Sequence, residues 1–572
     1  MADLFDFCRR LGGTAQNVAL KQMMEAVNLF EVLASSVIQA DVTSPVRPLT
    51  EDDLARARWQ YASQTRVQDT PARFWEFLPC VYGPGMIVLS QMLKAVSPVH
   101  LVGPDATLDG ASNVLPDGQD PWSGGSAQEQ ADWVSTILNE APPQTPALLL
   151  SFDGLAWFFA SRMGCFYLQP WLDPETHIPG YKAEFDQLTR FELKPHMCEA
   201  RKIALFFVAT RTEEHSMHKL VLKRIQFGTS DTIIEDEQHP LFLKACRTTL
   251  MVAVSDATIR YHAVFSHALT GDVFTCATVR ALPIGHAMRP LVEHLTHQVF
   301  NINNVLRMLV LAENGTAHTL FPYSWVGVQQ YLADIYSTYS IWNDGWRPWA
   351  RSVAHPCVGI VQDMGGIWDL LVGYVDDYLC AIGIYSDAGV LSDAPLCAWV
   401  TEVQLQQPNS ASAGEVASLF AAHPFECVRR LLQMFFFHSV CTHDVSGATD
   451  RLLSSAFCIP TQLFATDAPL SATSAEQDRE THEELPGKQL TRRAQIASHS
   501  TAMVVPLLCQ RWGDVMLPTV TCPPNMQAAK LVLNSLPTRL SALETIIRQR
   551  NKHRYFPTDS LFPTRLPCAI CY

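Results

Sequence analysis

The sequence predicts a mainly α-helical fold, with one large helical domain and a small strand-containing N-terminal part. Apolar residues make up 48% and charged residues 17% of the 572 positions, a balance typical of a globular chain with a large core. Two β-type runs, at residues 203–208 and 220–222, precede residue 240. After that point, apolar residues recur at helical spacing over long segments.

The chain shows no internal repeat and no clean linker. Residues 15–40 have apolar positions at helical spacing, and residues 104–130 are rich in Asp, Gly, Pro and Ser, which is typical of a loop. We therefore expect residues 1–150 to form a helical and loop region. It should belong to the same body as the main domain, residues 151–572.

The second half of the chain is expected to be almost entirely helical. The predicted helices are residues 246–265, 274–280, 286–310, 367–384, 416–440 and 526–550. Two polar segments, residues 405–415 and 466–489, are expected to be loops between them.

Composition excludes several classes of partner. Lys and Arg number 42 against 56 Asp and Glu, and the net charge of -14 opposes a grip on nucleic acid or on anionic membranes. The N-terminus lacks the basic and apolar regions of a signal peptide, and prolines and glycines interrupt the apolar segment 77–93. The 16 scattered cysteines are typical of reduced thiols. We expect a cytoplasmic monomer with at most peripheral membrane contact.

A pair of histidines is the first chemical signal. His262 and His267 lie five residues apart in an apolar stretch that suits a helix. Five residues of a regular α-helix turn through about 500°, which leaves the side chains ~140° apart and unable to share a metal. A π-turn would bring both rings to one side, and such turns concentrate at functional sites. His438 and His443 form a second such pair, and about 0.6 pairs arise by chance, so spacing alone fits structural histidines equally well.

Four blocks of sequence strengthen the signal because they follow the order of a known family's motifs. The first holds His262, His267, Asp272-Val-Phe274, Ala277-Thr-Val-Arg280, His286, His294, Ile302-Asn303 and Arg307; the others span residues 363–402, 434–443 and 540–572. Together they resemble the iron-binding helices, central helices and C-terminal tail of lipoxygenases. The resemblance covers residues 200 to 572. It implies the lipoxygenase catalytic fold with a π-bulge at the metal site, and no N-terminal β-sandwich is visible.

The resemblance also implies a metal site. It places one non-haem iron, with manganese as the alternative, on His262, His267, His443 and the main-chain carboxylate of Tyr572. The family's weak fifth ligand would fall on Gly447, which has no side chain, so either the adjacent Ser446 or no residue takes that role.

The activity implied is dioxygenation of a polyunsaturated fatty acid. In that family the metal-bound hydroxide, with no further catalytic side chain, takes hydrogen from a 1,4-pentadiene unit, and O2 then adds to give a hydroperoxide. Leu306 stands where the family keeps Ala or Gly, which predicts a place in the oxygen pocket. The departures leave open a degenerate lipid-binding protein or a hydroperoxide isomerase. His286, His294 and His297 are expected to be structural, and the lone pair Cys568 and Cys571 to hold no zinc.

Overall fold

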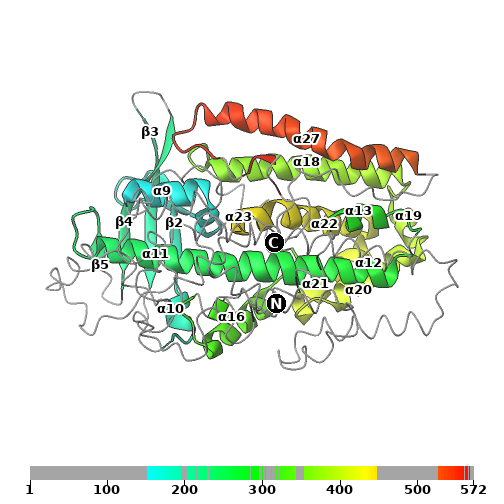
Figure 1. Cartoon of the computed structure of the whole chain (residues 1–572), viewed down its shortest axis with the longest axis horizontal. Helices are drawn as coiled ribbons and strands as arrows, with labels where there is room; N and C mark the ends of the chain where they lie inside the picture. The colour runs from blue at the N-terminus through cyan, green and yellow to red at the C-terminus, as the bar shows by residue number, and fades with distance from the viewer. Residues whose placement is uncertain are drawn as a thin grey trace, which may run out of the picture.

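The computed structural model of the chain describes residues 151–194, 202–212, 217–228, 232–283, 285–295, 299, 303, 311, 317–318, 321–342, 353, 355–447, 526–558, 561–563 and 566. The mainly helical fold predicted from the sequence is confirmed over these residues, with a single small sheet at one end (Figure 1). The predicted helical and loop region at 1–150 and the loop at 466–489 lie outside the described residues.

The sheet has five antiparallel strands in the order of the chain. They are β1 (Gln169–Leu172), β2 (Pro179–Phe185), β3 (Ile203–Arg211), β4 (His218–Phe227) and β5 (Thr232–Ile234). The two predicted β-runs are confirmed as β3 and β4, which pair from Ile203 opposite Phe227 to Arg211 opposite His218. The other three strands were not predicted, because β1 and β5 are short and β2 begins with Pro and Gly. Helix α9 (Phe152–Ser161) packs against β4.

The centre of the fold is one long helical rod. It consists of α11 (Phe242–Asp256), the π-helix η3 (Ala257–Asp272) and α12 (Val273–Ala281), which follow one another without a break (Figure 1). Beside it runs a second rod of α22 (Pro424–Phe437), the π-helix η5 (His438–Thr442) and α23 (His443–Gly447). Both η5 and α23 pack against η3, so the π-helical segments of the two rods meet in the core.

Other helices surround these rods. They are α10 (Gln187–Arg190), α13 (Arg289–Leu295), α16 (Trp325–Thr338), α18 (Gly359–Ala381), α19 (Asp387–Leu391), α20 (Ala394–Leu405), α21 (Ser410–Ala422) and α27 (Gln527–Asn551), with a short 3-10 helix η2 (Met163–Tyr167). Helix α20 is attached to α12 by two polar contacts between residues of the sequence blocks. Trp399 Nε1 donates to Thr278 Oγ1 at 3.0 Å, and Arg280 pairs with Glu402 at 3.1 Å.

Two expectations about the region after residue 400 are wrong. The predicted loop at 405–415 is mostly helix, because Asn409 accepts a hydrogen bond from the Ser412 N–H and starts α21 at Ser410. The single helix predicted at 416–440 is two helices that break at His423. Pro424 disfavours helical dihedrals in the residue before it, yet it suits the first turn of α22.

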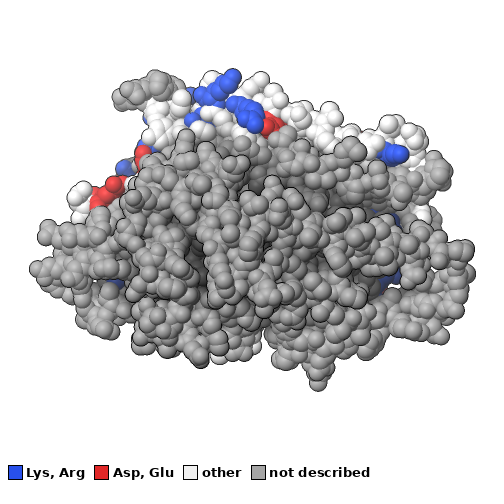
Figure 2. Space-filling model, in the orientation of Figure 1, with Lys and Arg blue, Asp and Glu red and all other residues white. Residues whose placement is uncertain are grey.

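Helices α18 and α27 lie side by side along one edge of the molecule, as Figure 1 shows. They approach closely at Gly366, where an added Cβ would lie 3.0 Å from the Leu543 side chain. Lys and Arg side chains gather on this edge in Figure 2. Among the described residues, none of the helices combines the length and hydropathy needed to span a bilayer.

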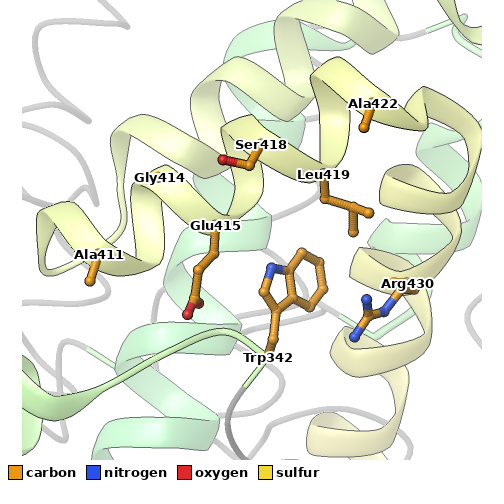
Figure 3. A pocket seen from close by; sticks show the side chains of 8 residues that line it. All are labelled: Trp342, Ala411, Gly414, Glu415, Ser418, Leu419, Ala422 and Arg430. Carbon is orange, nitrogen blue, oxygen red and sulfur yellow. The ribbon is translucent and has the colours of Figure 1, made fainter.

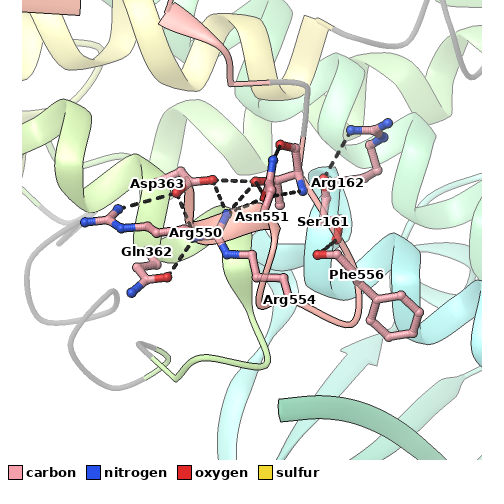
Figure 4. A network of polar contacts seen from close by, with 9 residues as sticks. Ser161, Arg162, Gln362, Asp363, Arg550, Asn551, Arg554 and Phe556 are labelled. Atoms are coloured by element: carbon pink, nitrogen blue, oxygen red, sulfur yellow. Dashed lines mark hydrogen bonds and ion pairs between the residues drawn. The ribbon is translucent and has the colours of Figure 1, made fainter. Parts of the chain in front are cut away.

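A buried polar network fastens the chain after α27 to α18 (Figure 4). Asp363 is fully buried, and the Arg554 guanidinium donates to both of its oxygens, at 2.6 and 2.8 Å. Thr558 donates to the same carboxylate, and Arg550 lies 3.5 Å from it. Gly359 leaves room for the Arg554 side chain, because a Cβ at position 359 would come within 2.9 Å of Arg554 Nε.

Candidate metal centre

The π-helix η3 places His262 and His267 on one side of the rod. An i→i+5 pattern sets residues five apart above one another, which a regular α-helix does not. The segment Ala257–Asp272 follows this pattern, and the Ser266 hydroxyl adds a side-chain hydrogen bond to the carbonyl of Tyr261, five residues earlier, at 2.9 Å. The π-turn expected from the histidine spacing is therefore present. It is longer than the single turn expected, because the π pattern extends over 16 residues.

A third histidine comes from the second rod. His443 follows the π-helix η5 directly and is fully buried, as is His267, whereas His262 is partly buried. The Nε2 atoms of the three residues form an almost regular triangle. The sides are 3.2 Å from His262 to His443, 3.3 Å from His262 to His267 and 3.1 Å from His267 to His443. The interplanar angles between the rings, 60° to 68°, are equally regular.

Hydrogen bonding among the imidazoles alone does not satisfy this triangle. Each neutral Nε2 either carries a proton and donates, or offers a lone pair and accepts. Among three such atoms, at least one contact therefore joins two donors or two acceptors. A ring N–H also lies in the plane of its ring and cannot point at both neighbours. A cation at the centre would instead receive all three lone pairs. The orientation of the rings therefore fits a metal ion better than it fits a set of structural histidines.

The distances also fit the size of a metal site. If a metal lay about 2.1 Å from each nitrogen, the usual imidazole distance, the nitrogen–metal–nitrogen angles would be about 95–104°. These angles suit three neighbouring ligands of a six-coordinate ion. Within the described part of the chain, this is the one group of His, Cys, Asp and Glu side chains whose ligand atoms converge in this way.

The two rods that carry the histidines also carry buried thiols, Cys441 on η5 and Cys276 on α12, and these are poor competitors for a metal. Cys441 lies two residues before His443, but burial, and secondarily the nearby Asp444, raise the pKa of its thiol well above the usual value. Burial likewise raises the pKa of Cys276 to about 12. Neither thiol belongs to the group whose ligand atoms converge, and a raised pKa leaves less of the thiolate, the form that binds metals strongly.

The histidines expected to be structural separate into two groups. His286 has a structural partner, because its Nε2 lies 3.0 Å from the Asp393 carboxylate at the start of α20. His294 lies on α13, and its side chain is outside the described part, as is the whole of His297.

The remaining predicted site residues are placed less completely. Ser446 is buried one turn after His443, and its hydroxyl donates to the Thr442 carbonyl at 2.6 Å, so only its oxygen lone pairs are left for a metal. Leu306, Tyr572, Cys568 and Cys571 lie outside the described residues, and their roles stay predictions.

Asn303 lies beside the metal centre without having been predicted to have a role there, although it belongs to the first sequence block. Its side chain is buried and touches the ring of His267, with 2.6 Å between Asn303 Oδ1 and His267 Nδ1. The two residues are 36 positions apart, and no local periodicity connects them.

An open pocket on the surface is not this centre. It is lined by Trp342, Ala411, Gly414, Glu415, Ser418, Leu419, Ala422 and Arg430 (Figure 3). The Arg430 guanidinium lies 4.7 Å from the centroid of the Trp342 ring, and Glu415 accepts a hydrogen bond from Ser340. None of the three histidines lines this pocket, so it belongs to α21 and α22 rather than to the metal centre.

Comparisons with known proteins identify the fold. No family model and no curated protein matches the sequence. Among solved structures, coral 8R-lipoxygenase has a TM-score of 0.62 at 14% identity, covering 77% of this chain and 70% of that one. A calcium-dependent 11R-lipoxygenase has a TM-score of 0.61 at 13% identity over 79% and 70% of the two chains. A lipoxygenase variant in complex with arachidonate has a TM-score of 0.62 at 13% identity over 78% and 71%. The fold is therefore that of the lipoxygenase catalytic domain, as the sequence predicted.

Proposed function

We propose that this chain is a lipoxygenase-type dioxygenase that uses one non-haem iron to convert a polyunsaturated fatty acid into its hydroperoxide. The observation that supports this most directly is the triangle of Nε2 atoms from His262, His267 and His443, set in a lipoxygenase fold. The substrate class follows the similarity to lipoxygenases, one of which was solved with arachidonate.

The three imidazole nitrogens favour a transition metal over magnesium or calcium. Three nitrogen ligands suit iron, manganese, cobalt or zinc, whereas magnesium and calcium require oxygen ligands. Bound iron would supply the one-electron oxidation that removes hydrogen from the doubly allylic carbon. The net change would be the addition of O2, with the hydrogen retained in the hydroperoxide, so no further oxidant or reductant would be consumed. Manganese is the alternative for the same chemistry.

The side chains of this protein hold and shield the site. The two buried histidines and the apolar core around both π-helices keep bulk water from the metal and from a carbon radical. Water exclusion strengthens the bond between a metal and its ligands and prevents side reactions of a radical.

The test measures metal and product together. The purified full-length chain should contain about one iron per protein by elemental analysis. With linoleate or arachidonate it should consume O2 and form a conjugated diene in equal amounts. Iron without O2 uptake would instead support the degenerate lipid-binding protein, a reading favoured by Gly447 at the weak-ligand position. Consumption of fatty-acid hydroperoxide without O2 uptake would support the isomerase.

The C-terminal carboxylate of Tyr572 is proposed as the anionic ligand. Three neutral imidazoles leave a ferric charge poorly compensated, and an oxygen anion would stabilise it. We expect Tyr572→Ile to keep metal and activity, because the ligand is main chain. A few Gly and Ser residues appended after Tyr572 should displace the carboxylate and lose both. If the extended protein keeps its full iron content by elemental analysis, the anion must come from a side chain such as Asp444.

A further inference from the structure

Asn303 joins one of the metal-centre histidines to a buried carboxylate. Its side-chain amide nitrogen donates to the carbonyl of His267 at 2.9 Å and to Asp272 Oδ1 at 2.6 Å. Its amide oxygen faces His267 Nδ1 at 2.6 Å. All three residues are at least 97% buried, since the exposed fractions are 1% for Asn303, 3% for Asp272 and 0% for His267.

The surroundings of this amide permit only one orientation. A backbone carbonyl can only accept a hydrogen bond, so the NH2 group must face His267 O, and Asp272 Oδ1 lies within hydrogen-bond distance of the same nitrogen. The amide oxygen must then face the imidazole. Because that oxygen cannot donate, Nδ1 of His267 carries the proton of this contact, and Nε2 is left with its lone pair directed into the triangle.

We propose that Asp272 and Asn303 are positioning residues that fix His267 as a metal ligand by locking the proton on Nδ1. The acceptors hold the amide of Asn303, the amide holds the imidazole, and the imidazole presents Nε2 to the metal. Asp272 is five residues after His267 and is the last residue of η3, so the same π-helix that aligns the histidines also aligns this carboxylate with them. The proposal depends on the proposed function only in requiring that the centre bind a metal.

The test measures metal affinity without substrate. Full-length apoprotein is titrated with Co(II), whose visible spectrum reports coordination, under conditions in which each variant is folded by circular dichroism. Asn303→Leu should weaken Co(II) binding about 10- to 100-fold, the usual effect of losing a hydrogen-bond partner of a metal-bound histidine. Asp272→Ala should weaken it less. Asp272→Asn, which still offers an oxygen to the Asn303 amide, should restore most of the affinity.

A control variant separates positioning from general loss of stability. Thr278, on α12 of the same rod, accepts a buried hydrogen bond from Trp399 on α20, and Thr278→Val removes this bond without touching the histidines. It should lower the melting temperature and leave Co(II) affinity unchanged. Wild-type affinity in Asn303→Leu, or an equal loss in Thr278→Val, would overturn the proposal.

Two further outcomes keep the test decisive. If Asn303→Leu does not fold, equal affinities in Asp272→Ala and Asp272→Asn would overturn it. A wild-type protein that binds Co(II) normally but forms no hydroperoxide would overturn the dioxygenase function alone. A wild-type protein that binds no metal would overturn both.

Discussion

Replacing His443 by Ala is expected to remove the metal and abolish dioxygenation. The substitution deletes one corner of the Nε2 triangle, whose sides are 3.1 Å to His267 and 3.2 Å to His262. Losing a ligand should weaken binding by more than the ~100-fold that loss of a ligand's hydrogen-bond partner causes. Iron content, Co(II) titration and O2 uptake measure the effect.

The apoprotein should respond in the opposite direction from the metal-loaded protein. Without metal, the triangle contains at least one contact between like atoms, and removing one imidazole relieves it. We therefore expect the apo form of His443→Ala to unfold at a urea concentration no lower than wild-type apoprotein. Metal at 100 times its Kd should stabilise the wild type by about 2.7 kcal/mol, an increment that the variant should lack.

His438→Ala is the matched control for this prediction. His438 is also buried, lies on the same rod and forms the other five-residue pair with His443, but it is not part of the triangle. It should cost stability and keep the metal. The opposite pattern, with metal lost from His438→Ala and kept in His443→Ala, would show that the register of this helix is wrong.

The local part of the site could be predicted from the sequence, and the long-range part only in outline. The spacing of His262 and His267 requires a π-turn if they are to share a metal, and the fold contains one. That spacing does not set the length of the turn, which depends on how η3 packs against η5 and α23. The choice of His443 over His438 came from a family pattern, because the two are equivalent in local spacing.

No periodic pattern in the sequence predicts the contacts that complete the metal centre. His443 lies 176 residues from His267, and Asn303 lies 36 residues from it. Such pairs arise from the three-dimensional fold, whereas apolar periodicity reports only which face of a helix is buried. The same limit explains the errors after residue 400. Pro408, Asn409 and Gly414, with two serines between them, look like loop residues until Asn409 is considered as a helix cap. Pro424 breaks a helix that periodicity alone would continue.

A second large effect is expected at the network between α18 and the chain after α27. Arg554→Leu would leave Asp363 fully buried, with only the Thr558 hydroxyl and the more distant Arg550 to compensate its charge. Removing one partner of a buried ion pair typically costs about 3–5 kcal/mol, because the remaining charge stays desolvated. The unfolding free energy in urea should fall by that amount. Replacing both Asp363 and Arg554 by Leu should recover part of the loss.

A control for Arg554→Leu comes from the same two helices, and the C-terminal tail gives a further prediction about metal affinity. Arg539 pairs with Asp377 between α27 and α18 at 2.6 Å, but the side chains are 32% and 54% exposed, so Arg539→Leu should cost only about 0–1 kcal/mol. Beyond Arg554 the chain passes through buried Leu561 and Leu566 toward Tyr572. If the terminal carboxylate is a ligand, freeing this segment should also weaken metal binding in Arg554→Leu and not in Arg539→Leu. Equal Co(II) affinities in folded samples of the two variants would show that the network stabilises the fold without positioning the tail.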